Sequence, residues 1–281
     1  MGHVLKTTFL LGLLTFLVVF CGYALDGLQG AGVAFFVSCL MNFGVYWFSS
    51  KIVLAMHRAQ LLLEEEAPEV FEIVRNLSAK AGIPMPRLYM LPSASANAFA
   101  TGRDPQHAAI ALTHGIVGLL NREELSGVLG HELSHILNRD VLLASIVATL
   151  AGALSRVASM ARWSFLWGGE RDERDSTHPL AWVLASILMP LIALLIQLAI
   201  SRAREYAADQ RGAELCEEPL YLASALRKID ITSQRLPLRD ADPATAHLFI
   251  VNPLSGKGGC SLFSTHPSME DRIARLEVMK P

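Results

Sequence analysis

Charged residues are scarce in this sequence, and one long region has almost none. Only 18% of the 281 residues are charged, against about a quarter in an ordinary soluble domain. The mean hydropathy is +0.37. Between Lys6 and Lys51, Asp26 is the only charged residue. This distribution excludes a simple soluble enzyme and favours a membrane protein.

Long runs of one charge and paired cysteines are also missing. The 24 basic and 26 acidic residues give a net charge of −2 without a basic stretch, so we expect no nucleic-acid partner. The cysteines form no C-x-x-C pair; they are Cys21, Cys39, Cys216 and Cys260. This excludes a disulfide scaffold and a cysteine-type zinc site, and it fits a reducing compartment.

The N-terminal apolar region has the length of two membrane spans. Asp26 divides it into the runs 7–25 and 27–50, of 19 and 24 residues. Because a hydrocarbon core needs about 20 helical residues, residues 1–50 are predicted to form a transmembrane hairpin. A cleaved signal peptide is the alternative for the first run, but a second run follows it at once.

The basic residues around this hairpin predict its orientation. Lys6 precedes it, Lys51 and Arg58 follow it, and the turn around Asp26 contains neither lysine nor arginine. Cytoplasmic loops carry an excess of lysine and arginine, so both ends of the hairpin are expected in the cytoplasm. The chain beyond Lys51 is therefore expected on the cytoplasmic side.

A second apolar pair occupies residues 141–201. Its runs are 141–155, which is short for a span, and 179–201, where Pro190 predicts a kink. The linker 163–178 carries six charged residues, which disfavour translocation. We expect the pair to cross the membrane and return, and a hairpin lying on the membrane is the alternative.

The water-soluble part is thereby split in two. From Pro68 to Gly82, apolar residues recur with a helical period between an early proline and a final glycine, which predicts a surface helix. Three short β-like runs follow, at 87–90, 96–100 and 108–112. The predicted fold is mainly α with a small β-sheet. The predicted segments are a membrane hairpin at 1–50 and a second apolar pair at 141–201. The protease domain is predicted in two parts, at 51–140 and 202–281.

One predicted helix carries a metal-binding pattern. Asn121 and Glu124 form a capping-box pattern ahead of an apolar stripe, which predicts a helix start. On this helix, H-E-L-S-H begins at His131 and ends at His135. Imidazoles four residues apart project from one helix face and can bind one Zn²⁺, while Glu132 can reach a bound water as general base. The alternative is an exposed helix with two solvated histidines.

A zinc hydrolase needs a third protein ligand and a fourth position for water. After the last apolar run, S-R-A-R-E-Y-A-A-D places Glu205 and Asp209 on one face of a predicted helix. We expect Glu205 to bind the metal. Asp209 is expected to contact a ligand histidine without binding the metal and so to fix the tautomer of that ring. The alternative for Glu205 is a solvated Arg–Glu pair beside the membrane.

Three separated motifs resemble the M48 family of zinc metallopeptidases. They are H-E-L-S-H-I-L-N-R-D, S-R-A-R-E-Y-A-A-D and F-S-T-H-P-S-M-E-D-R-I-A-R-L. The apolar hairpins and N-A-F-A-T-G at 97–102 resemble its heat-shock membrane proteases. The resemblance covers essentially the whole chain and implies a zincin-like metallopeptidase domain fused to transmembrane helices. It also implies one Zn²⁺ per chain on His131, His135 and Glu205, with Glu132 as the base.

The resemblance further implies a location and a substrate class. It places the chain in the bacterial inner (cytoplasmic) membrane as a multi-pass protein whose active site faces the cytoplasm. The implied substrates are misfolded or damaged membrane polypeptides, which the protein would remove under stress. The implied partners are the lipid bilayer and other quality-control proteases.

Two further site assignments follow from the same family. His266 precedes a helix predicted to be capped by Ser268, and we expect it to stabilise the oxyanion. A loop histidine that fixes the turn is the alternative. Because zincin substrates commonly lie extended along an edge strand, a substrate-binding run is expected, with a plain core strand as the alternative. The run comprises Asn97, Ala98, Phe99 and Ala100.

Two other functions could use the same residues. They are a catalytically silent metal-binding adaptor and a metal-transport protein. Transport usually places ionisable groups within membrane spans, whereas here the predicted ligands flank the spans. Every residue that peptide hydrolysis needs is also present, so the sequence predicts a zinc metalloendopeptidase.

Overall fold

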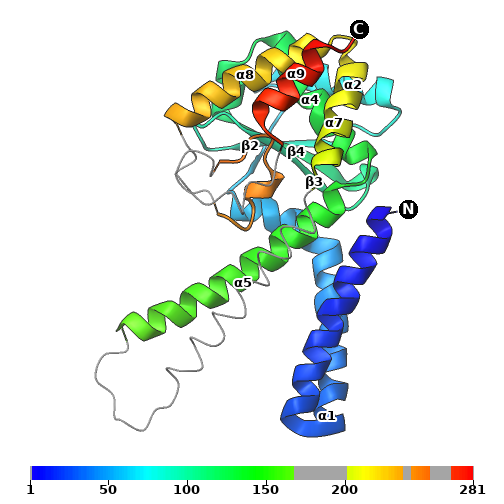
Figure 1. Cartoon of the computed structure of the whole chain (residues 1–281), viewed down its shortest axis with the longest axis vertical. Coiled ribbons are helices and arrows are strands. Elements are labelled where there is room, and N and C mark those ends of the chain that lie inside the picture. The colour runs from blue at the N-terminus through cyan, green and yellow to red at the C-terminus, as the bar shows by residue number, and fades with distance from the viewer. Residues whose placement is uncertain (1, 168–200, 237–241, 254–266, 281) are drawn as a thin grey trace.

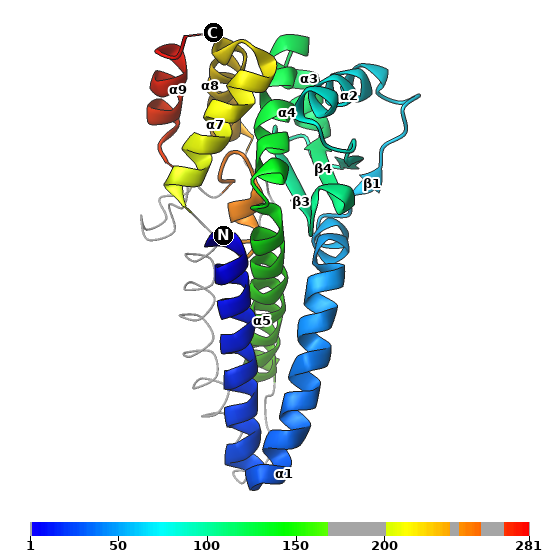
Figure 2. The ribbon, with the colours of Figure 1, turned by 90° about the vertical axis from the view of Figure 1, so that its right-hand side faces the viewer.

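The fold joins a helical domain on a small sheet to long helices that project from one side (Figure 1). It is known from a computed structural model that describes residues 2–167, 201–236, 242–253 and 267–280. Figure 2 shows both arms of the N-terminal helix and helix α5 leaving the same side of this domain. The predicted class, mainly α with a small sheet, is confirmed.

Helix α1 (Gly2–Met56) is a hairpin. Its backbone leaves the helical region at Asp26 (φ −146°) and at Gly27, whose φ of 55° favours glycine. Across the two arms, Asn42 Nδ2 donates to Thr15 Oγ1 at 2.8 Å. The hairpin predicted around Asp26 is therefore present, and both of its ends point toward the domain, on either side of α5 (Figure 2).

Membrane-spanning length is found in one described helix. Asp26–Met56 is long and apolar enough to cross a bilayer, whereas the apolar stretch Thr7–Phe20 is shorter. Helix α5 (Val141–Trp167) begins after an 89° bend from the preceding helix. The segments Arg122–Leu137 and Val141–Ala153 have the length and hydropathy of a membrane span only when taken together. Of the other predicted apolar run, 179–201, all but the last residue lies outside the described residues.

The sheet has four strands in the order β1-β2-β4-β3. Strands β2 (Arg87–Leu91), β3 (Ala98–Gly102) and β4 (Ala108–Thr113) confirm the three predicted runs, and β1 (Gln60–Leu61) is an addition. β2 pairs in parallel with β4, while β1 pairs antiparallel with β2 and β3 with β4. This order leaves β3 at one edge of the sheet.

The helices cover the sheet and enclose the core. Helix α4 (Arg122–Leu137) lies centrally and packs against the sheet edge and three other helices. Its predicted capping box is present: Asn121 Oδ1 accepts from Glu124 N at 2.8 Å. The remaining described helices are α2 (Pro68–Ala81), α3 (His114–Leu119), α7 (Arg202–Cys216), α8 (Pro219–Arg235) and α9 (Met269–Glu277), with short 3-10 turns at Pro105–His107 and Ala246–Leu248.

Candidate metal centre

Two helices that cross closely bring three ligand side chains together. Gly130 on α4 faces Gly212 on α7, and a Cβ on Gly212 would lie only 2.7 Å from the backbone nitrogen of His131. The absence of side chains at this crossing lets α7 approach the H-E-x-x-H segment. Glu205, on the first turn of α7, thereby reaches the two histidines of α4.

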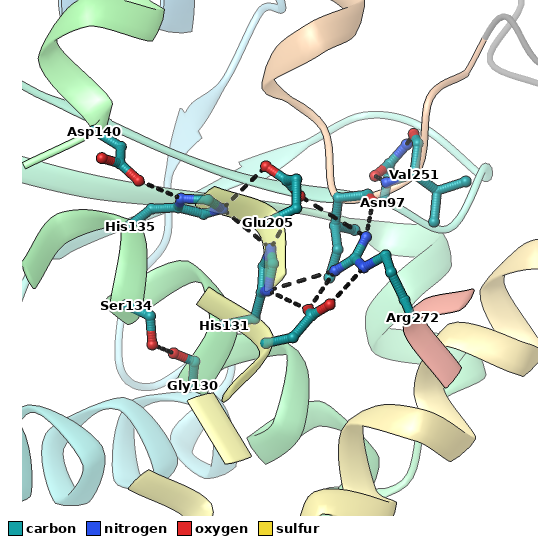
Figure 3. Close-up of polar contacts among 11 residues, drawn as sticks. Asn97, Gly130, His131, Ser134, His135, Asp140, Glu205, Val251 and Arg272 are labelled. Atoms are coloured by element: carbon teal, nitrogen blue, oxygen red, sulfur yellow. Dashed lines mark hydrogen bonds and ion pairs between the residues drawn. The ribbon is translucent and has the colours of Figure 1, made fainter. Parts of the chain in front are cut away.

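The geometry of these three residues suits a metal ion (Figure 3). His131 Nε2 and His135 Nε2 are 3.1 Å apart, and Glu205 oxygens lie 3.8 and 3.7 Å from them. One ligand atom from each residue lies within 4.8 Å of the others. Two ligand atoms of a tetrahedral Zn²⁺ at 2.0–2.1 Å would be separated by about 3.4 Å, a value between these distances.

A carboxylate lies behind each imidazole. Asp209, on α7, is 2.9 Å from His131 Nδ1, and Asp140, just after α4, is 3.2 Å from His135 Nδ1. A neutral imidazole that donates from Nδ1 has its lone pair on Nε2. Both lone pairs therefore face the carboxylate of Glu205, and this set of donors needs a cation between them.

The electrostatics of the cluster also favour positive charge. Burial alone would lower the pKa of His135, but Asp140, Glu205 and Glu132 outweigh it and raise that pKa to about 9. Burial lowers the pKa of His131, which lies beside the Arg272 guanidinium. The carboxylates thus attract one positive charge to this pair of rings, as they would attract a metal ion.

Glu132 lies beside the ligands rather than among them. Its side chain is buried and borders a cavity of about 50 Å³ together with the three ligands. Burial, reinforced by Glu205, raises its pKa to about 7. The backbone of Ala100, on the edge strand, lies near this carboxyl group and works against the rise in its pKa. Such a carboxylate can accept a proton and return it near neutral pH.

Arg272, on α9, joins the cluster to the C-terminal helix. Its side chain is fully buried and donates to Asp209 Oδ1 at 2.6 Å and Oδ2 at 2.8 Å. A third bond, of 2.9 Å, reaches the carbonyl oxygen of Ile250. Burial would raise the pKa of Asp209, but Arg272 and His131 hold that pKa down at about 2. Asp209 is therefore ionised, and it can orient His131.

The predicted substrate run forms the start of the edge strand. All four of its residues are buried, and Ala100 borders the cavity. The outer edge at Asn97 and Ala98 is already paired, because Ile250 N donates to the Ala98 oxygen at 3.0 Å and the Asn97 side chain bonds to Val251. The structure thus places the run beside the metal cluster with part of its edge covered.

The remaining site residues fall into two groups. His266 lies outside the described residues, so its predicted role stays a prediction. Asp140 and Arg272 were not predicted as site residues. Asp140 stands inside the H-E-L-S-H-I-L-N-R-D motif and could have been found from its place just past the metal helix. Arg272 stands inside the F-S-T-H-P-S-M-E-D-R-I-A-R-L motif, but that motif does not reveal its contacts, because its partners are 22, 63 and 141 residues away along the chain.

Known proteins match this chain over nearly its full length. The profile of Peptidase family M48 covers residues 64–280. The protein named Protease HtpX homolog from Syntrophobacter fumaroxidans is 52% identical, with 99% of this chain and 100% of that protein aligned. Those from Thermodesulfovibrio yellowstonii and Pyrococcus furiosus are 53% and 50% identical, with 99% and 98% of this chain and 98% and 95% of theirs aligned.

A solved structure has the same fold. The crystal structure of S. mikatae Ste24p aligns with a TM-score of 0.50 and 18% identity, over 98% of this chain and 65% of that one. At that identity the likeness concerns the fold alone, and this chain spans about two thirds of the Ste24p chain. From the length and the sequence identity of the family matches we conclude that this chain belongs to peptidase family M48 and is a membrane metallopeptidase.

Proposed function

We propose that this protein is a zinc-dependent endopeptidase that cleaves misfolded or damaged membrane polypeptides at the cytoplasmic face of the bacterial inner membrane, as part of a stress response. The observation that carries the proposal is the convergence of His131, His135 and Glu205 beside a buried Glu132. The two histidines and Glu205 would hold the zinc, and Asp209 and Asp140 would fix the two rings.

The chain's own residues account for the proton transfers of peptide hydrolysis. Zinc, when bound there, supplies Lewis acidity toward the scissile carbonyl and toward water. Glu132 accepts the proton of the attacking water on its carboxylate and passes it to the leaving amine. A pKa near neutrality suits both steps, and burial accounts for that pKa.

The membrane location follows from the hairpin and its charges. The two ends of α1 lie on the same side, next to the catalytic helices (Figure 2). Lys6 and Lys51 mark those ends, while the turn at Asp26 has no basic residue. Cytoplasmic loops carry an excess of lysine and arginine, which supports a metal centre on the cytoplasmic side, close to the bilayer surface. A polypeptide leaving the bilayer would meet the site there, which supports membrane proteins as substrates.

The substrate is proposed to lie extended along β3. This strand is at the sheet edge, and its Ala100 borders the same cavity as Glu132. Main-chain pairing ignores side-chain identity, so a broad cleavage specificity follows. Such breadth suits an enzyme that removes damaged proteins of many sequences.

Turnover of unfolded casein by the purified, zinc-loaded protein tests the proposal. Glu132→Gln should keep its zinc and lose about 10²–10⁴-fold in rate, because an amide cannot accept the proton. Glu123→Gln, an exposed position on the same helix, is the matched control and should behave as wild type. Undiminished proteolysis by Glu132→Gln would refute the mechanism.

The cellular part of the proposal needs its own assay. A misfolded multi-pass membrane protein should persist longer in cells that carry only Glu132→Gln than in cells with Glu123→Gln. An unfolded soluble reporter in the same cells serves as comparison. Equal half-lives of the membrane reporter in the two strains would contradict the proposed substrate class.

A further inference from the structure

A short segment of the chain occupies the edge of β3 where the proposed function puts the substrate. It consists of Phe249, Ile250 and Val251, and we name it the strap. Ile250 N donates to the carbonyl oxygen of Ala98 at 3.0 Å, a bond of the kind that joins neighbouring strands. The strap thereby covers the outer edge of the strand beside the metal cluster.

The bonds that hold the strap use its backbone only. Asn97 Nδ2 donates to the oxygen of Val251 at 2.8 Å, and Val251 N donates to Asn97 Oδ1 at 3.3 Å. Arg272 Nη1 donates to the oxygen of Ile250 at 2.9 Å. Figure 3 shows Arg272, Glu205 and the Asn97–Val251 pair close together. Any polypeptide with its N–H and C=O groups in these positions could make the same four bonds.

Side-chain packing adds to this hold. The ring of Phe249 lies edge-on to Phe99 of β3, with centroids 5.2 Å apart, and also contacts the ring of His57, just beyond the end of α1. Phe249, Ile250 and Val251 are all nearly fully buried. The strap is therefore part of the packed domain rather than a surface loop.

The space left beside the metal cluster is small. The cavity that the strap residues Phe249 and Ile250 help to enclose measures about 50 Å³. A space of this size holds a few waters. The strap therefore lies in the way of a polypeptide that would pair with β3 at Ala98 on its path to Glu132.

We propose that the strap is an internal stand-in for the substrate, which keeps the site closed until an incoming polypeptide replaces it on β3. The proposal rests on the proposed function, since it assumes that substrate pairs with this edge. Replacement exchanges one set of main-chain bonds for an equivalent set, and side chains of the incoming polypeptide take the place of the buried Phe249, Ile250 and Val251 side chains. Substrates that can pair over several residues are therefore favoured over folded proteins, whose strands are already paired.

Hydrogen exchange tests the replacement directly. The zinc-loaded Glu132→Gln protein, full length in detergent, is compared with and without a saturating unstructured casein peptide, which it binds but does not cut. Deuterium uptake at Ile250 and Val251 should rise when the peptide binds, while uptake at Ile110, within β4, should not change. Unchanged or reduced uptake at the strap on binding would overturn the proposal.

A substitution in the strap gives a second test. Ile250→Pro removes the N–H that bonds to Ala98, and Phe249, with ψ of 144°, already has the backbone conformation required before proline. Loss of one such bond should lower KM for casein about fivefold with little change in kcat. Ile250→Val keeps the N–H and nearly all the volume, so it should match wild type.

The outcomes separate the strap from the proposed function. A zinc-loaded wild-type protein that does not cut casein would contradict the proposed function. The proposal for the strap alone would be contradicted by three results together. These are a wild type that cuts casein, a KM that Ile250→Pro does not change, and a strap whose deuterium uptake does not rise when the peptide binds. If Ile250→Pro loses its zinc or its fold, the proposal is judged from the hydrogen-exchange measurement on Glu132→Gln.

Discussion

Removing the buried guanidinium of Arg272 should destabilise the whole catalytic domain. Arg272→Met keeps much of the side-chain volume but leaves the Asp209 carboxylate, 5% exposed, without its two bonds of 2.6 and 2.8 Å. Breaking one side of a buried ion pair costs about 3–5 kcal/mol, because the remaining charge is not solvated and keeps only the hydrogen bond from His131. For a chain of this size that corresponds to a fall in thermal midpoint of roughly 6–20 °C.

The measurement separates this effect from metal loss and self-digestion. Thermal unfolding is followed at a fixed scan rate on metal-free protein that also carries Glu132→Gln, so that neither zinc nor proteolysis contributes. Arg275→Met is the matched control, because that guanidinium lies at the surface, 3.8 Å from the Tyr206 ring. We expect the midpoint of Arg275→Met to fall by much less than that of Arg272→Met.

A double-mutant cycle identifies the partner. Asp209→Asn alone leaves the Arg272 guanidinium with only the Glu205 carboxylate, 3.9 Å away, whereas the pair Arg272→Met with Asp209→Asn removes both charges of the buried ion pair. The double variant should therefore be more stable than the sum of the single effects by about 2 kcal/mol or more. Additive effects, within about 0.5 kcal/mol, would refute the reasoning that the pair acts as a unit.

Further predictions concern the ligands and the topology. Glu205→Ala should lose most of its zinc by metal analysis while the exposed Glu214→Ala keeps it, and full occupancy in Glu205→Ala would reassign the third ligand. Asp140→Asn, which weakens the acceptor behind His135, should cost about 10–100-fold in zinc affinity, measured by competition with a chelator. With the native cysteines removed, Leu28→Cys at the hairpin turn should react with an impermeant thiol reagent added to intact cells, and Glu65→Cys should stay protected; the reverse pattern would invert the proposed orientation.

Local patterns in the sequence determined the elements and the metal motif. The α4 helix follows from its capping box and apolar stripe, and the spacing of His131 and His135 puts both rings on one helix face wherever the helix lies. The turn at Asp26 and Gly27 could likewise be read from a break in an apolar run. These features depend on residues a few positions apart, so neighbours in the chain suffice to specify them.

Only the tertiary structure decided what surrounds those elements. The order β1-β2-β4-β3, with a parallel β2–β4 pair, depends on strands that meet across intervening chain. The contact of Arg272 with Asp209 joins positions 63 residues apart, and the strap reaches Asn97 across 154 residues. No periodicity or spacing encodes such pairings, because they are set by which buried charges and main-chain groups find partners when the helices pack. The sequence could therefore predict the metal ligands, while the charge that holds Asp209 in place and the segment that closes the site became visible only in the folded chain.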